Sequence, residues 1–180
     1  MNMKKYALIL HAWFNHPQDN WYPWLAKELI DRGYKVYMPE IPTLDTNTPD
    51  MDKALSSIKK SIPLTKDSII IGHSLGALLA MRLAEKQEFQ KIFLIEGWDF
   101  DDLTREHISF WKTKINHTAI KKHIKDIFVV ASDNDPYMTP FTEEEMSKRL
   151  GGTFILVKGA GHFLKKTGVT TIPQLLKYIS

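Results

Sequence analysis

The chain has 180 residues, of which 43% are hydrophobic and 25% are charged, and its formal net charge is +3. The absence of cysteine excludes disulfides, thiolate zinc sites and cysteine nucleophiles, and it is compatible with the reducing cytoplasm, where we expect the protein. No run of residues approaches the roughly 20 apolar residues of a membrane helix, and no platform of aromatic and basic residues indicates nucleic-acid binding.

Short apolar runs alternate with longer helical patterns. In chain order, the expected elements are strand Tyr6–Leu10, helix Trp21–Asp31 capped by Asn20, strand Lys35–Met38, helix Met51–Ser61, strand Ser68–Ile71, helix Leu75–Lys86, strand Lys91–Ile95, strand Ile127–Ala131, helix Phe141–Leu150, strand Thr153–Val157 and helix Thr171–Ile179. The connection between the fourth and fifth strands must hold a crossover helix and is too short for a lid domain. This alternation predicts one α/β domain over residues 1–180, with a doubly wound, mostly parallel six-stranded sheet covered by helices on both faces.

A Gly-x-Ser-x-Gly pentapeptide at residues 72–76 directly follows the apolar run Ser68–Ile71 and precedes a helical pattern. A strand, a sharp turn of this composition and a helix together are typical of a nucleophile elbow. The glycines permit a turn in which a Cβ atom would clash, and the serine hydroxyl then projects above the sheet. We therefore expect Ser74 to be a catalytic nucleophile.

His162 is the best placed of the seven histidines to act as the base. A serine hydroxyl needs such a base at neutral pH, usually a histidine oriented by a carboxylate. His162 lies in a glycine-rich loop after the last predicted strand, so its imidazole can lie over the end of the sheet. His107, His117 and His123 fall in a long polar connection, where we expect them to face solvent.

Two aspartates follow the fifth predicted strand, and either could orient the base. Pro136 keeps Asp135 in extended backbone, and Asp135 also lies farther beyond the strand, where it can reach a neighbouring loop. Asp133 is better suited to bond the backbone of its own turn. We expect Asp135 to be the acid, which makes the chain order nucleophile, acid, base, as in elbow folds.

An oxyanion needs two preorganised donors, and backbone N–H groups are expected to supply both. The first is that of Leu75, at the start of a helix whose dipole favours negative charge. The second is expected from Trp13 in the loop after the first strand, with Ala12 as the next candidate. The residues expected to line the substrate pocket are Ala12, Phe14, Trp98 and Trp111, with Phe100 as a further aromatic nearby.

On these residues the chain resembles the small serine hydrolases of the α/β-hydrolase superfamily, typified by retinoblastoma-binding protein 9 and its bacterial relatives. The resemblance covers nearly the whole length and rests on Trp21-Tyr22-Pro23-Trp24, Gly72-His73-Ser74-Leu75-Gly76-Ala77 continuing to Ala80-Met81-Arg82, Asp135-Pro136 and Gly161-His162-Phe163. It implies a compact core without a lid, the parallel strand order 2-1-3-4-5-6, and the triad Ser74, Asp135 and His162. Such proteins usually carry a glycine in the first oxyanion loop, where this chain has Ala12.

The expected function is therefore hydrolysis of small ester or related acyl substrates through an acyl-enzyme, with no metal and no organic cofactor. The competing hypothesis is a binding or scaffold protein that keeps the fold and has lost useful turnover, and the altered loop at Ala12 motivates it. A nucleotide-binding domain is disfavoured because neither Gly-x-Gly-x-x-Gly nor a P-loop is present. Nucleic acid and membrane are not expected as partners. The retinoblastoma protein is not expected either, because the Leu-x-Cys-x-Glu motif of that partnership needs a cysteine.

Overall fold

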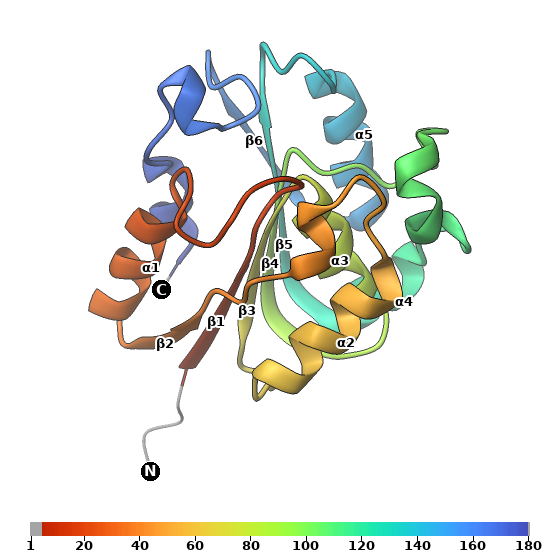
Figure 1. Ribbon diagram of the computed structural model, residues 1–180. Coiled ribbons are helices and arrows are strands. Elements are labelled where there is room, and N and C mark those ends of the chain that lie inside the picture. Colours follow the sequence, from red (N-terminus) through yellow and green to blue (C-terminus); the bar gives the residue numbers. More distant parts are fainter. Residues whose placement is uncertain (1–4, 180) are drawn as a thin grey trace.

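Six parallel strands form one sheet in the computed structural model, which describes residues 5–179 (Figure 1). The strands are β1 (Lys5–Leu10), β2 (Tyr34–Tyr37), β3 (Ile69–His73), β4 (Phe89–Ile95), β5 (Ile124–Ser132) and β6 (Thr153–Val157). Their order is β2-β1-β3-β4-β5-β6, and every pair of neighbours is parallel. The predicted fold class and strand order are confirmed. The expected domain over 1–180 also includes residues 1–4 and 180, which lie outside the described residues.

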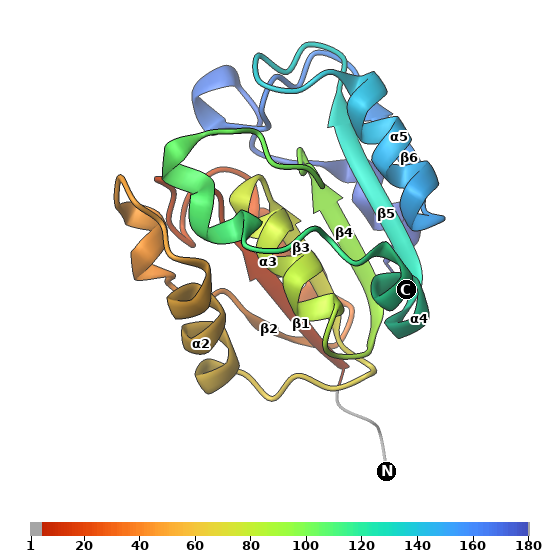
Figure 2. The same cartoon turned by 90° about the vertical axis from the view of Figure 1, so that its right-hand side faces the viewer.

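Helices cover both faces of this sheet (Figure 1). The α-helices are α1 (Tyr22–Asp31), α2 (Met51–Ser61), α3 (Leu75–Ala84), α4 (His117–His123) and α5 (Pro140–Leu150). The short 3-10 helices are η1 (Pro42–Asp45), η2 (Arg105–Trp111), η3 (Lys165–Thr167) and η4 (Pro173–Tyr178). Helix α1 and the C-terminal segment lie on one face, and α2, α3 and α5 lie on the other; Figure 2 looks onto the face that α3 covers.

Alternate side chains of each central strand enter two different hydrophobic cores. In β1, Leu8 and Leu10 pack with residues of α2 and α3, whereas Ala7 and Ile9 pack with residues of α1. Successive strand residues point to opposite faces, so a strand covered on both sides must be apolar at successive positions. This two-sided burial explains why the strands appear in the sequence as unbroken apolar runs.

Two details of the expected elements are wrong. Residues 171–179 do not form an α-helix; η4 closes i to i+3 hydrogen bonds there, such as that from the Ile179 N–H to the Leu176 carbonyl at 3.4 Å. The 3-10 helix is common in short segments and connections, although the six residues of η4 are longer than most such runs. Asn20 does not cap α1, because its φ is +52° and its Oδ1 atom accepts the Lys165 N–H at 2.8 Å.

The carboxyl ends of the parallel strands meet at one edge of the sheet, and the site residues follow four of them. Trp13 follows β1, Ser74 follows β3, Asp135 follows β5 and His162 follows β6. In open α/β sheets this edge is where ligands bind, because the loops there surround a crevice.

Candidate active site

Ser74 lies in a strained turn between β3 and α3, with φ +55° and ψ −119°. A Cβ atom on Gly72 would lie 2.4 Å from the Gly76 carbonyl oxygen, and one on Gly76 would lie 2.3 Å from the Leu10 carbonyl oxygen. Because both approaches are to backbone, only glycine fits at either position. The Ser74 N–H donates to the Ile95 carbonyl at 2.8 Å, which ties the turn to β4. The sequence therefore builds the elbow geometry with the serine at its apex.

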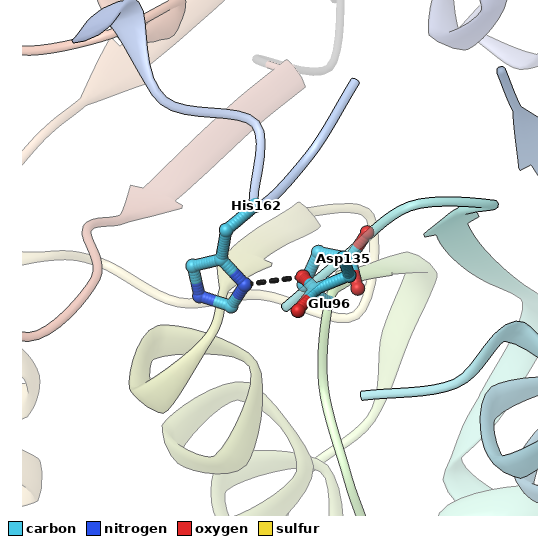
Figure 3. Close-up of side chains that lie close together, drawn as sticks. All are labelled: Glu96, Asp135 and His162. Atoms are coloured by element: carbon cyan, nitrogen blue, oxygen red, sulfur yellow. Dashed lines mark hydrogen bonds and ion pairs between the residues drawn. The ribbon is translucent and has the colours of Figure 1, made fainter. Parts of the chain in front are cut away.

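The His162 Nδ1 and Asp135 Oδ2 atoms lie 2.5 Å apart (Figure 3). The Asp135 side chain is fully buried, and its Oδ1 atom accepts the N–H groups of Tyr137 and Met138. Burial opposes ionisation of Asp135, but the hydrogen bond and charge of His162, with further hydrogen bonds, keep its pKa below the ordinary value. An ionised Asp135 thus fixes the imidazole with Nδ1 protonated and leaves Nε2 as the basic nitrogen.

The three residues before Asp135 hold the backbone of the His162 loop. Ser132 Oγ accepts the Ala160 N–H at 3.0 Å. Asp133 Oδ1 accepts the Gly159 N–H at 2.7 Å, and Asn134 Oδ1 accepts the Gly161 N–H at 2.7 Å. Asp133 therefore bonds the backbone of the neighbouring loop, and Asp135 is the aspartate that meets the imidazole. The sequence did not indicate that the side chains of Ser132 and Asn134 bind this loop, because only the pairing of β5 with β6 brings them to it.

Ser74 and His162 line the same pocket of about 710 Å³, although no hydrogen bond joins their side chains in the described residues. Catalytic hydrogen bonds are often long before a substrate binds.

Leu75 is the first residue of α3, where backbone N–H groups have no acceptor inside the helix. In the loop after β1, the Ala12 N–H donates to the Tyr22 hydroxyl at 3.1 Å, whereas the Trp13 N–H has no acceptor within residues 5–179. The Trp13 N–H is therefore free to bind a ligand, and that of Ala12 is not.

His73 connects the elbow to two other parts of the site. Its Nε2 atom lies 2.9 Å from the His162 carbonyl oxygen, and its Nδ1 atom lies 2.6 Å from the Tyr22 hydroxyl. Burial, reinforced by the nearby His162, lowers the pKa of His73 to about 3, so the ring is neutral. A carbonyl only accepts, so Nε2 carries the proton, and Nδ1 accepts from Tyr22. No motif in the sequence indicates this positioning role.

Three of the four residues expected to line the substrate pocket line the serine pocket, as does the expected oxyanion residue Trp13, whereas Trp111 does not. Ala12, Trp13, Phe14 and Trp98 line it together with Ser74 and His162. Phe100 and Trp111 instead line a separate cavity of about 780 Å³ beside Asp99 and Arg149. The expectation for Trp111 is corrected by the path of η2, whose His107 and Phe110 are buried toward the protein. Residues three apart share a side of a 3-10 helix, so Trp111, which directly follows Phe110, lies on a different side of η2 and lines the separate cavity.

His107 is buried rather than solvent-facing, which corrects a second expectation. Its Nδ1 atom lies 2.8 Å from Asp102 Oδ2, and its ring lies between those of Trp13 and Trp98, with centroids 4.9 Å and 5.6 Å away. His107 therefore forms part of the pocket wall. A histidine in a polar stretch of sequence gives no sign of this, because the aromatic partners come from other loops.

Glu96 and Glu143 are two buried carboxyl groups that the sequence interpretation overlooked. Glu96 follows the apolar run of β4 at the edge where the other site residues lie, and this position was the signal that could have identified it. Three side chains approach one another at this edge (Figure 3). A carboxylate oxygen of Glu96, a carboxylate oxygen of Asp135 and a ring nitrogen of His162 lie within 4.8 Å of one another. Oxygen and imidazole donors of this kind can bind a divalent cation, but the facing Nδ1 and Oδ2 atoms already bond each other.

Comparisons with known proteins show similarity to serine hydrolases along most of the chain. A family model described as serine hydrolase matches residues 7–180. YdeN of Bacillus subtilis strain 168, which is named as a hydrolase, is 26% identical to this chain over 178 residues. The match covers 95% of this chain and 92% of that protein. The serine hydrolase RBBP9 of Rattus norvegicus is 27% identical over 150 residues, covering 79% and 77% of the two chains.

Solved structures share the fold. The crystal structure of the ydeN gene product from B. subtilis has a TM-score of 0.87 at 22% identity and covers 98% of this chain and 97% of that chain. Est1E from Butyrivibrio proteoclasticus has a TM-score of 0.72 at 14% identity, with 100% and 90% of the two chains covered.

In the part of this chain that the structure describes, none of the helices has the length and apolar character needed to cross a bilayer.

Proposed function

This chain belongs to the serine hydrolase family, and on that basis we propose that it cleaves small ester or related acyl substrates through an acyl-enzyme formed on Ser74. The observation that carries the proposal is the 2.5 Å contact between His162 Nδ1 and a fully buried Asp135, at a pocket that Ser74 also lines. A base oriented in this way beside an elbow serine is the arrangement that acyl transfer requires.

In the first half of the reaction, Ser74 Oγ attacks the substrate carbonyl carbon while His162 Nε2 removes the hydroxyl proton. The carbonyl oxygen becomes an oxyanion, which the N–H groups of Leu75 and Trp13 stabilise. His162 then returns the proton to the leaving alcohol, thiol or amine as the carbon–heteroatom bond breaks. In the second half, His162 activates a water that hydrolyses the acyl-enzyme and releases Ser74. Asp135 stays ionised throughout and stabilises the imidazolium.

The pocket favours an acyl group that is short or aromatic. Its volume is about 710 Å³, within the usual range for small-molecule sites, and the rings of Trp13, Phe14 and Trp98 form much of its apolar wall. The rings of Trp13 and Phe14 are stacked with centroids 4.8 Å apart, which makes this wall rigid. A flat acyl group can pack on it without a lid.

The alternative is a binding protein with this fold and little turnover. It is favoured by Ala12 and by the bulky Trp13 and Phe14 in the first loop, where Phe14 adopts φ +52°. A backbone strained at this position could hold the Trp13 N–H away from an oxyanion. Turnover would then be slow even with His162 oriented.

Labelling with a small fluorophosphonate, followed by intact-mass measurement, separates the two functions. We expect one adduct on the wild-type protein and none on Ser74→Ala or His162→Ala. His16→Ala is the matched control, because His16 is exposed and contacts Glu40 outside the pocket; it should label like the wild type. A folded wild-type protein that takes no adduct would contradict the hydrolase proposal and favour the binding protein.

A further inference from the structure

Three carboxyl groups lie together behind the candidate base. Glu96 is 1% exposed, Glu143 is fully buried, and the Asp135 side chain is fully buried. The groups that act electrostatically on Glu96 are the carboxyls of Glu143 and Asp135, and those that act on Glu143 are Glu96 and Asp135. No lysine or arginine forms an ion pair with either glutamate in the described residues. Three buried negative charges without a cation are not stable together, so some of these groups must be protonated.

Glu96 is held rigidly, and one of its carboxylate oxygens lies within 4.8 Å of ligand atoms of Asp135 and His162. Its backbone has φ +47°, and its N–H donates to the Val130 carbonyl at 3.0 Å. Its Oε1 atom accepts the Ser132 N–H at 2.7 Å, while its Oε2 atom is buried with no partner among residues 5–179 that donates to it. A buried oxygen without a donor is costly if it is anionic, but it becomes a hydrogen-bond donor once it carries a proton.

Asp135 has room for such a donor. It already accepts from Tyr137, Met138 and His162, and a carboxylate has about four acceptor positions. Of the three carboxyls in the described residues, Asp135 alone is hydrogen-bonded to an imidazole, so it keeps its charge and the glutamates keep protons. We propose that Glu96 is the neutral acid that donates a hydrogen bond from Oε2 to Asp135, and that it is thereby a positioning residue for the Asp135–His162 pair.

Burial raises the pKa of Glu96 far above its ordinary value, and the charges of Glu143 and Asp135 raise it further. The consequence for catalysis rests on the proposed function. A carboxylate bonded by Glu96 on one side and by the 137–138 backbone on the other cannot rotate, so the His162 Nδ1–H stays aligned. The proton that orients Asp135 in this arrangement is the one on the buried Glu96 carboxyl.

Two substitutions at one position test the proposal. Glu96→Gln is neutral and keeps an N–H donor in the place of the acid proton, so kcat/KM on a small aryl ester should stay within about twofold of wild type. Its pH–rate profile should also keep the same acid limb. Glu96→Met is similar in size without a donor, so kcat should fall by about tenfold or more at unchanged KM.

Three results would overturn the proposal. An ionised Glu96 would favour the protonated imidazole, so Glu96→Gln would then move the acid limb toward lower pH. A Glu96→Met variant with wild-type kcat would show that Asp135 needs no second donor. Activity that requires added Zn²⁺ and is lost in Glu96→Gln would likewise make Glu96 an ionised ligand and overturn the neutral acid.

Infrared spectroscopy tests the protonation state without activity. The C=O stretch of a protonated carboxyl should be present at neutral pH in the wild type and be reduced in Glu96→Gln, and an unchanged spectrum would overturn the proposal. The fluorophosphonate adduct on wild-type Ser74 separately reports the proposed function. If the adduct fails while the infrared band is lost in Glu96→Gln, the hydrolase proposal is wrong and the neutral Glu96 stands.

Discussion

The ring of His73 donates its Nε2–H to the backbone carbonyl of His162, so the residue before the candidate nucleophile fixes the loop that carries the candidate base. The contact spans 89 positions of sequence. On the other side of the ring, the Tyr22 hydroxyl donates to Nδ1 and accepts the Ala12 N–H. One line of hydrogen bonds therefore passes from the oxyanion loop through α1 and the elbow to His162.

Removing the Tyr22 hydroxyl should break this line at its centre. Tyr22→Phe leaves the Ala12 N–H and His73 Nδ1 buried without partners, which should lower the free energy of unfolding by about 1–3 kcal/mol. It should also lower kcat, because the His162 and Trp13 loops are then less firmly held. Urea denaturation and ester hydrolysis measure the two effects. Tyr178→Phe is the matched control, since its hydroxyl has no partner in the described residues; equal effects in both variants would contradict the line.

The two aspartates after β5 should differ sharply in catalysis. Asp135→Asn keeps the shape but offers His162 the wrong hydrogen-bonding group, and comparable changes in triad enzymes cost about 10⁴ in kcat. Asp133→Asn still presents an oxygen to the Gly159 N–H, so kcat should stay within about threefold of wild type. Steady-state kinetics on one ester suffices for both. The reverse ranking would show that Asp133 is the acid.

The elbow should store measurable strain at Ser74. The residue has φ +55°, a region that costs L-amino acids about 1 kcal/mol or more relative to glycine. Ser74→Ala should therefore abolish hydrolysis with little change in stability, whereas Ser74→Gly should abolish it and raise the free energy of unfolding by about 1 kcal/mol. Denaturant titration of the three proteins makes the comparison. Equal stability of the alanine and glycine variants would show that the turn is relaxed.

Glu143 should make stability fall as pH rises. Burial raises its pKa to about 8 from an ordinary value of 4.5. Between these values the folded state holds a proton that the unfolded state has released, so the free energy of unfolding decreases by up to about 1.4 kcal/mol per pH unit. Below the lower value both states are protonated, and above about 8 both are ionised, so the contribution is constant in each of those ranges.

Glu143→Gln should remove the part of this slope that Glu143 contributes, leave the part that the buried Glu96 contributes, and become more stable than wild type as pH rises; urea titrations between about pH 5 and pH 9 would measure this. Glu145→Gln on the same helix is the control, because Glu145 is only partly buried and the hydrogen bond from Lys148 lowers its pKa. That variant should keep the wild-type slope. A parallel slope in Glu143→Gln would mean that this carboxyl is ionised in the fold.

The strands were predictable from the sequence because their burial pattern is local, whereas their order came from the resemblance to the small α/β-hydrolases. Runs such as Ile69-Ile70-Ile71 are apolar at successive positions only because both faces of β3 are buried. The choice of Asp135 over Asp133 also had a local cause, since Pro136 restricts the backbone before it. The contact with His162 then follows from the adjacency of β5 and β6.

The residues 96–126 were less predictable because their side chains are oriented by tertiary contacts. His107 is buried since Asp102 and two indole rings surround it, and none of these contacts leaves a periodic pattern. Trp111 follows a buried neighbour in a 3-10 turn, and its direction depends on a helix type that composition does not reveal. Glu96 was overlooked because a single acidic residue after a strand is usually solvated.

The separation of Ser74 from His162 along the chain also matters during synthesis. Residues 69–84 form the elbow and its helix, whereas the candidate base and the carboxylate that orients it come from loops after β5 and β6. Until β6 joins the edge of the sheet beside β5, the serine has no base to ionise it. In the proposed mechanism, a partly made chain therefore presents a serine without its base, and reactivity toward acyl compounds requires the last parallel strand.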